Sequence, residues 1–144
     1  MLQKLNTKRG GFTLVEIMIV VAIIALLASI AVPNFLRSRK RSQATQCLED
    51  LRLIDAAIDQ YAIENNLTAA DPVVWADLQA YLKTGSRLEQ SANTDFLGNA
   101  YDAFAIDSIP QVTDATYNAL SDVASEDSGF WGAHKAAAAP PVAP

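Results

Sequence analysis

The stretch GGFTLVEIMIVVAIIALLASIAVPNFLRSRKR, residues 10–41, decides the fold of this chain. Residues 17–32 within it carry no charge and only one hydroxyl group, that of Ser29. As a helix rising about 1.5 Å per residue, residues 12–36 would span roughly 37 Å, more than the roughly 30 Å hydrocarbon core of a bilayer. The sequence therefore predicts a helix that inserts into a membrane.

One acidic residue, Glu16, lies a turn inside this apolar run. A carboxylate in a spanning helix costs about 2.5–3.5 kcal/mol at the centre and less near an end, so its presence marks a candidate functional residue. The alternative is a position among the lipid headgroups without a role of its own.

Composition and charge leave two other questions open: whether the segment is a cleaved signal peptide, and how it is oriented in the membrane. A secretory signal peptide cleaved before Val32 would also have a basic start and an apolar stretch, although the run is long and contains an acid. The flanking charges give almost a tie under the positive-inside rule, so they do not set the orientation. The basic residues before and after the run are Lys4, Lys8 and Arg9, and Arg37, Arg39, Lys40 and Arg41.

The residues Gly11-Phe12-Thr13-Leu14-Val15-Glu16, after a short basic leader, resemble the type III signal of type IV pilins and type II secretion pseudopilins. Pro33 is similarly placed in that family. The resemblance implies that prepilin peptidase cuts between Gly11 and Phe12 on the cytoplasmic face and methylates the new amine of Phe12. It also implies that the leader stays inside and the body outside.

The same resemblance implies a mode of assembly. Glu16 would pair with the Phe12 amine of an adjacent copy, and desolvation makes such a pair a device for register more than for stability. The subunit would wait in the lipid of the inner membrane, and an assembly platform and an ATPase would then add it to a helical filament of copies of itself. No cofactor is implied.

The helix is expected to continue beyond Pro33, with a kink or a locally melted turn at the proline. Apolar residues then recur every three or four positions, which is typical of an amphipathic helix. They are Ala44, Cys47, Leu48, Leu51, Ile54, Ile58 and Tyr61. Asn65-Asn66 is a plausible end, since Asn tolerates the left-handed cap, and Cys47 is interpreted as a small buried hydrophobe.

The remaining sequence predicts a small mixed body. Asp71-Pro72 is expected to start a helix that ends near Gly85, residues 101–106 to form a strand after a turn at Gly98-Asn99, and residues 113–124 a short helix. The segment DFLGNAY, residues 95–101, resembles the turn and strand that follow the helix in pseudopilins and short pilins.

These elements together predict an α+β, pilin-like fold, in which a long kinked N-terminal helix packs on a small antiparallel sheet. The predicted divisions are a leader (1–11), a transmembrane and filament-core helix (12–36), an amphipathic continuation (37–66), a small globular head (67–132) and a disordered Ala/Pro tail (133–144).

Charge and composition limit the chemistry of the body. Four of the eleven basic residues but fifteen of the sixteen acids follow position 41, which argues against non-specific nucleic-acid binding by this part. The single cysteine excludes an intrachain disulfide, and the single histidine, His134, makes a His-based catalytic or metal site improbable. Calcium-ligand candidates are Asp107, Asp114, Asp122, Glu126 and Asp127, but without a recognisable loop spacing they are interpreted as solvated surface.

The sequence thus favours a structural filament subunit, not an enzyme. The rivals are a pseudopilin of a type II secretion system and a membrane-anchored enzyme or binding module with an ordinary signal anchor. The basic residues 37–41 are interpreted either as anchors at lipid headgroups or as contacts to acidic bodies of neighbouring copies.

Overall fold

The computed structural model describes residues 11–68, 71–101 and 104–135. The chain divides into two compact units, Met1–Arg37 and Ser38–Pro144. The described elements are α1 (Leu14–Asn65), β1 (Pro72–Val73), α2 (Trp75–Leu78), the 3-10 turn η1 (Gln79–Tyr81), α3 (Arg87–Gln90), β2 (Phe104–Ala105), α4 (Asp114–Leu120), and the 3-10 turns η2 (Glu126–Ser128) and η3 (Gly132–His134). Of the leader predicted for residues 1–11, residues 1–10 lie outside the described residues.

Helix α1 is capped at both ends by residues that favour those positions. The hydroxyl of Thr13 accepts a hydrogen bond from the backbone N–H of Glu16 (3.2 Å), which satisfies one of the free donors of the first turn. At the other end, Asn66 takes a left-handed φ of 51°, and the N–H of Leu67 bonds back to the carbonyl of Ala62 (3.1 Å). The predicted end at Asn65-Asn66 is confirmed.

Pro33 lies inside α1, and the residues on both sides of it are helical. The expectation that the helix resumes after the proline is therefore confirmed. The alternative of a locally melted turn is wrong, because α1 is helical without a break from Leu14 to Asn65. The kink itself stays a prediction.

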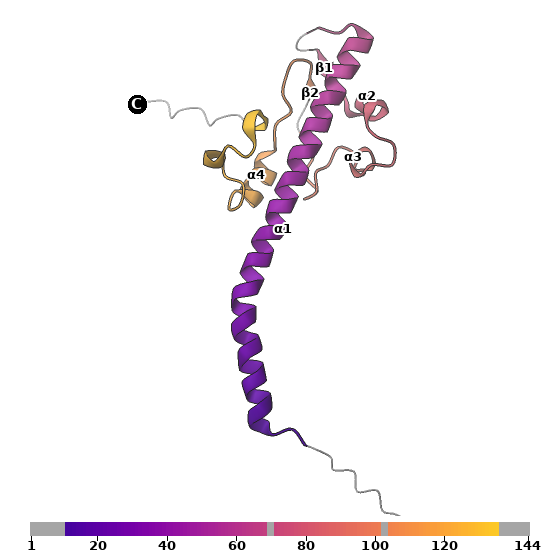
Figure 1. The fold of residues 1–144 in the computed structure, drawn as a ribbon. Helices are drawn as coiled ribbons and strands as arrows, with labels where there is room; N and C mark the ends of the chain where they lie inside the picture. The colour runs from indigo at the N-terminus through magenta and orange to yellow at the C-terminus, as the bar shows by residue number, and fades with distance from the viewer. Residues whose placement is uncertain (1–10, 69–70, 102–103, 136–144) are drawn as a thin grey trace, which may run out of the picture. The chain divides into compact units, whose positions relative to one another are not determined.

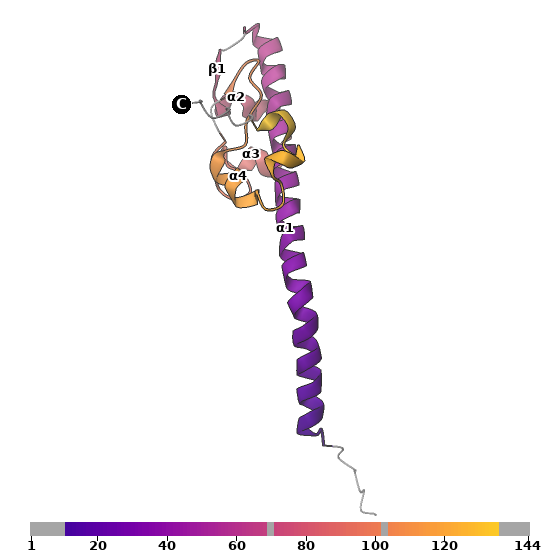
Figure 2. The same ribbon diagram turned by 90° about the vertical axis from the view of Figure 1, so that its left-hand side faces the viewer.

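The second unit is built on one face of residues 38–65 of α1. Figure 1 shows α2 and α3 on one side of this stretch and α4 on the other, and Figure 2 shows the same elements beside it in a turned view. The inward face is the predicted stripe, with Leu51 and Ile54 fully buried and Cys47 at 1% exposure. The core is completed by residues from β1, α2, α3, β2, α4 and the loops between and after them: Val73, Leu78, Leu82, Leu88, Tyr101, Phe104, Ile106, Val112, Leu120, Ala124 and Trp131.

The sheet of this α+β fold has two short antiparallel strands. Pro72 of β1 pairs with Ala105 of β2, and Val73 pairs with Phe104. Pro72 lacks an N–H and fits a two-stranded sheet in which it need not donate. The predicted strand at residues 101–106 is thus confirmed for Phe104–Ala105, and residues 102–103 lie outside the described part.

The helix predicted to begin at Asp71-Pro72 is wrong in its start. The carboxylate of Asp71 accepts bonds from the N–H and hydroxyl of Thr68 (3.0 and 3.2 Å), so it closes a turn and caps no helix. Pro72 lies in β1, and α2 begins only at Trp75. Pairing with a strand thirty residues downstream overrode the local helix signal, a non-local effect that propensity cannot register.

Two further predictions are corrected near the C-terminus. The helix predicted for residues 113–124 is α4, Asp114–Leu120, which is capped by the hydroxyl of Thr113. The tail predicted as disordered from residue 133 is ordered through Lys135, because His134 belongs to η3 and its carbonyl accepts from Val112 N–H (2.7 Å). Residues 136–144 lie outside the described part.

Trp131 is the largest fully buried side chain of the described residues, at 2% exposure, and its indole N–H donates to the carbonyl of Ala124 (2.8 Å). Trp131→Ala is expected to lower the free energy of unfolding by about 3–5 kcal/mol, because it leaves a cavity and a lost hydrogen bond. The matched control is Leu53→Ala on the outer face of α1, where 54% of the residue is exposed and the expected loss is about 1 kcal/mol or less. Chemical unfolding of the full chain in detergent, followed by near-UV circular dichroism, measures both, and equal losses would contradict the assignment of Trp131 to the core.

Candidate functional site

The bond between Gly11 and Phe12 lies in a segment without regular secondary structure just before α1. Nothing lies within 4 Å of the position that a Cβ at Gly11 would occupy, and Phe12 is 76% exposed. The backbone on this side of the bond is therefore free to enter the active site of a peptidase. Cleavage here would place a new amine one helical turn before Glu16.

Glu16 occupies the first turn of α1 and is exposed. Its carboxylate has no hydrogen bond or ion pair with another described residue, while its backbone N–H is capped by Thr13. An acid in the first turn also interacts favourably with the helix dipole. Sequence reasoning missed this second, local role, although the Thr13-x-x-Glu16 spacing of a capping box signals it.

The apolar residues around Glu16 find no cover within their own unit. The most apolar 18-residue window of α1 has a mean hydropathy of 2.9, and none of it is buried. Each large apolar side chain from Phe12 to Leu36 is about half exposed or more. By length and composition this helix can cross a membrane. Ser29 donates its hydroxyl proton to the carbonyl of Leu26 (2.7 Å), so the one hydroxyl of the run is satisfied inside the helix.

Two of the basic residues after the apolar run bind within the chain. Lys40 forms an ion pair with Asp122 (2.9 Å). Arg41 donates to the carbonyl of Val123 (2.8 Å) and lies over the ring of Phe130, 4.8 Å from its centroid. These contacts hold the segment after α4 against α1, which the sequence reading did not foresee.

The other two basic residues of this group, Arg37 and Arg39, are exposed. Neither has an ion pair or a side-chain hydrogen bond with any described residue. They are therefore the members of the group that stay available to lipid headgroups or to another molecule.

A buried polar cluster lies in the core of the second unit. Asp50, 6% exposed, accepts a hydrogen bond from the Tyr101 hydroxyl (2.9 Å) and forms an ion pair with Arg87. Asp95, 5% exposed, accepts from the N–H groups of Leu97 and Asn99 (2.8 and 2.9 Å) and from the hydroxyl of Thr116.

Each of the two buried carboxylates in this cluster is thus satisfied by several donors. The arrangement explains the Asp-x-x-Gly-Asn turn of residues 95–99, in which Gly98 takes a φ of 87°. It stabilises the loop.

Two of the acids considered as calcium ligands form ion pairs with lysines. Asp114 pairs with Lys135 (2.8 Å) and Asp122 with Lys40, and the Lys135 ammonium lowers the pKa of Asp114. Among the described residues there is no group of three or more metal-ligating side chains. The ring Nδ1 of His134 lies 2.9 Å from the carbonyl of Pro110, so its contact is with the backbone.

Comparison with known proteins bears on the N-terminal segment. Residues 6–32 match the family described as the prokaryotic N-terminal methylation motif. The N-terminal segment is therefore similar to those of proteins that carry this motif on an apolar helix.

Several curated proteins match over a longer stretch. The type II secretion system core protein G of Aeromonas hydrophila is 34% identical over 59 residues, 41% of each chain. The protein of that name from Pseudomonas aeruginosa is 34% identical over 90 residues, 61% of each chain. The type IV major pilin protein PilA of Myxococcus xanthus is 40% identical over 63 residues, 44% of this chain and 29% of the pilin.

The chain is thus similar to type IV pilins and to type II secretion pseudopilins. It spans about two fifths of the length of the first of these curated relatives. No solved structure matches the chain.

Stability is expected to fall at alkaline pH, because burial raises the pKa of both the Cys47 thiol and the Tyr101 hydroxyl. A group whose pKa is raised by folding stabilises the fold below its unfolded pKa, and that contribution is lost as the pH rises toward the folded value. The loss begins between about pH 8.5 and 10, the ordinary values for Cys and Tyr, at up to about 1.4 kcal/mol per pH unit for each group. Unfolding curves taken from pH 7 upward measure this slope.

The control is the double substitution Cys47→Ala with Tyr101→Phe, which removes both titrating groups. Its stability is expected to be lower throughout, because the hydrogen bond to Asp50 is lost, but to fall less steeply above about pH 9. An equal slope in the two proteins would show that other groups govern the alkaline loss.

Proposed function

We propose that this chain is a structural subunit of a type IV pilus-like filament and not an enzyme. One observation supports the proposal: the segment with the methylation motif, residues 12–36, exposes apolar side chains that no described residue of its own unit covers. Exposed apolar surface of this extent must be covered by lipid or by protein. A membrane covers it before assembly, and copies of the same helix cover it in a filament.

The steps of assembly follow from the residues around the motif. Prepilin peptidase cuts between Gly11 and Phe12 and methylates Phe12. The leader is cytoplasmic and the second unit lies on the far side of the inner membrane. Glu16 then pairs with the Phe12 amine of a neighbouring copy, and Pro33 kinks the helix so that copies can pack. Since lipid already covers the apolar face, transfer to the filament gains little free energy, which is why an assembly platform and an ATPase are needed.

A second candidate function is that of a pseudopilin in a type II secretion system. It is favoured by the match to core protein G of Pseudomonas aeruginosa, which extends over 61% of each chain, further than the match to the pilin. Deleting the gene separates the two: loss of surface fibres under the electron microscope supports the pilus, and retention of exported proteins in the periplasm supports the pseudopilus.

The mature protein is expected to begin with N-methylated Phe12, as mass spectrometry of its N-terminal peptide would show. Gly11→Leu is expected to keep the leader, because a side chain at this position hinders the close approach of the backbone to the peptidase. The control Leu14→Ala, on the mature side, is expected to be processed like the wild type. A mature wild-type chain that begins at Met1 or near Val32 would overturn the proposal in favour of an ordinary signal anchor or signal peptide.

Glu16→Leu and Glu16→Ala are expected to insert into the membrane at normal levels but to lower the yield of sheared filaments by about tenfold or more, the effect of leaving the partner amine buried and unpaired. Glu16→Gln keeps the size of the side chain and separates charge from shape, and it is expected to fail as Leu does. Loss of the helix-dipole contribution alone, about 0.3–1 kcal/mol, is too small for that effect. Normal filament yield from Glu16→Leu or Glu16→Ala would refute the pairing.

A further inference from the structure

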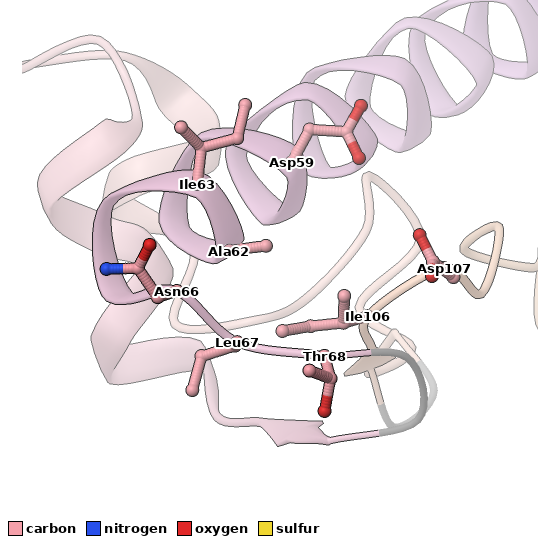
Figure 3. Close-up of a pocket in the computed structure, with 8 residues that line it drawn as sticks. All are labelled: Asp59, Ala62, Ile63, Asn66, Leu67, Thr68, Ile106 and Asp107. Carbon is pink, nitrogen blue, oxygen red and sulfur yellow. The ribbon is translucent and has the colours of Figure 1, made fainter.

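A hollow of about 600 Å³ lies where α1 ends, in the second unit. It is lined by the last turns of α1 and by the chain around β2: Asp59, Ala62, Ile63, Asn66, Leu67, Thr68, Ile106 and Asp107. Figure 3 shows Asp59 and Asp107 toward one side of it and Asn66 toward the other, with Ala62 and Ile106 between them. The hollow thus combines an apolar floor with two carboxylates at its edge.

The carboxylates of Asp59 and Asp107 have no ion pair or hydrogen bond with any residue that the structure describes. The body offers few cations for them. Of the four basic residues after position 41, Arg52, Arg87 and Lys135 are paired with Glu49, Asp50 and Asp114, which leaves Lys83. The nearby carboxyl of Asp55 has its pKa raised by burial and by the charge of Asp59. The negative charge at the hollow is therefore poorly compensated within the chain.

A suitable cation for the two carboxylates is an arginine that has no partner among the described residues. Arg39 is exposed and, among the described residues, has no partner, whereas Lys40 and Arg41 are engaged. Its stem can lie on the apolar floor while its planar guanidinium donates to both carboxylates.

Arg39 cannot reach the hollow of its own chain. It lies twenty residues before Asp59 on one continuous helix, a separation of about 30 Å at 1.5 Å per residue. A contact between them must therefore join two copies.

The direction of the two side chains agrees with such a contact. At about 100° per residue, Arg39 and Asp59 project about 200° apart around α1, on nearly opposite sides. A polymer formed by head-to-tail contacts needs the donor patch and the acceptor patch on different surfaces of each subunit.

We propose that, in the polymer, Arg39 of one copy enters the hollow of a second copy and pairs with Asp59 and Asp107. The inference rests on the proposed function, because it requires copies that lie side by side. Parallel copies joined in this way are staggered by about 30 Å along the helix, whereas a pair between Phe12 and Glu16 staggers them by about 6 Å. The two contacts therefore join different pairs of copies, and the Arg39 contact ties the polymer together laterally.

The test is a charge exchange in the full chain, expressed in its native host in place of the wild type. Arg39→Glu is expected to lower the yield of sheared filaments about fivefold, the size of effect that an exposed ion pair supplies. The control Arg37→Glu makes the same charge change two residues earlier, about 200° around the helix, and is expected to stay within about twofold of the wild type.

Rescue decides between a specific contact and a general effect of charge. Arg39→Glu with Asp59→Arg is expected to restore filaments to within about twofold of the wild type. Arg39→Glu with Asp127→Arg has the same net charge but places the new base elsewhere on the exposed surface, so it is expected to fail. Normal filaments from Arg39→Glu, or equal rescue by both second changes, would overturn the inference and leave the proposed function standing. A wild-type chain that forms no polymer would overturn both.

Cross-linking provides a direct readout of the contact. Filaments carrying Arg39→Cys with Asp107→Cys, treated with a short bismaleimide, are expected to give a ladder of dimers and higher species on a denaturing gel. The native Cys47 is buried at 1% exposure and identical in all samples. Arg37→Cys with Asp107→Cys is the matched control and is expected to give little ladder. Even a fivefold lower yield leaves filaments to treat, so the absence of a ladder from the first pair would count against the contact.

Discussion

The structure depends on a single constraint: residues 14–36 of α1 expose apolar side chains that no described residue of their own unit covers. Water cannot be the long-term neighbour of such a surface, so the chain is incomplete without lipid or further copies. Backbone polarity adds to the constraint, because only a helix satisfies its N–H and C=O groups within a single span. The other features of the N-terminal segment can be understood as controls on whether lipid or another copy surrounds this helix.

Under the proposed function, Glu16 is such a control. Its carboxylate is a cost in lipid, whereas the amine of another copy would supply an opposite charge in the filament. Its place in the first turn, after the capping hydroxyl of Thr13, keeps that carboxylate near the end of the helix. The charge thus costs the membrane-bound subunit less than it would at the bilayer centre and is still available to a partner.

The second unit uses the same helix in a different way. Residues 44–58 of α1 form one side of a core that β1, α2, α3, β2 and α4 complete, and Trp131 is buried in the same core. Lys40 and Arg41 hold the segment around Asp122 and Val123 in place. With those cations engaged, Arg39 stays exposed, and the two carboxylates at the hollow at the end of α1 have no partner among the described residues. In the proposed polymer, this separation of charges would give neighbouring copies complementary surfaces.

The sequence by itself determined the features that depend on neighbours along the chain. Uninterrupted hydropathy predicts the apolar helix, the three-to-four spacing of apolar residues predicts the buried stripe through Cys47 and Leu51, and Asn66 predicts the end of α1, because each of these signals is local. Only the tertiary structure decided the contacts made across long separations in the chain. Asp71-Pro72 reads as a helix start but pairs as a strand with residues 104–105, and the basic residues after the apolar run are divided between in-chain partners and open surface. Such choices rest on which distant groups the fold brings together, and no local pattern contains that information.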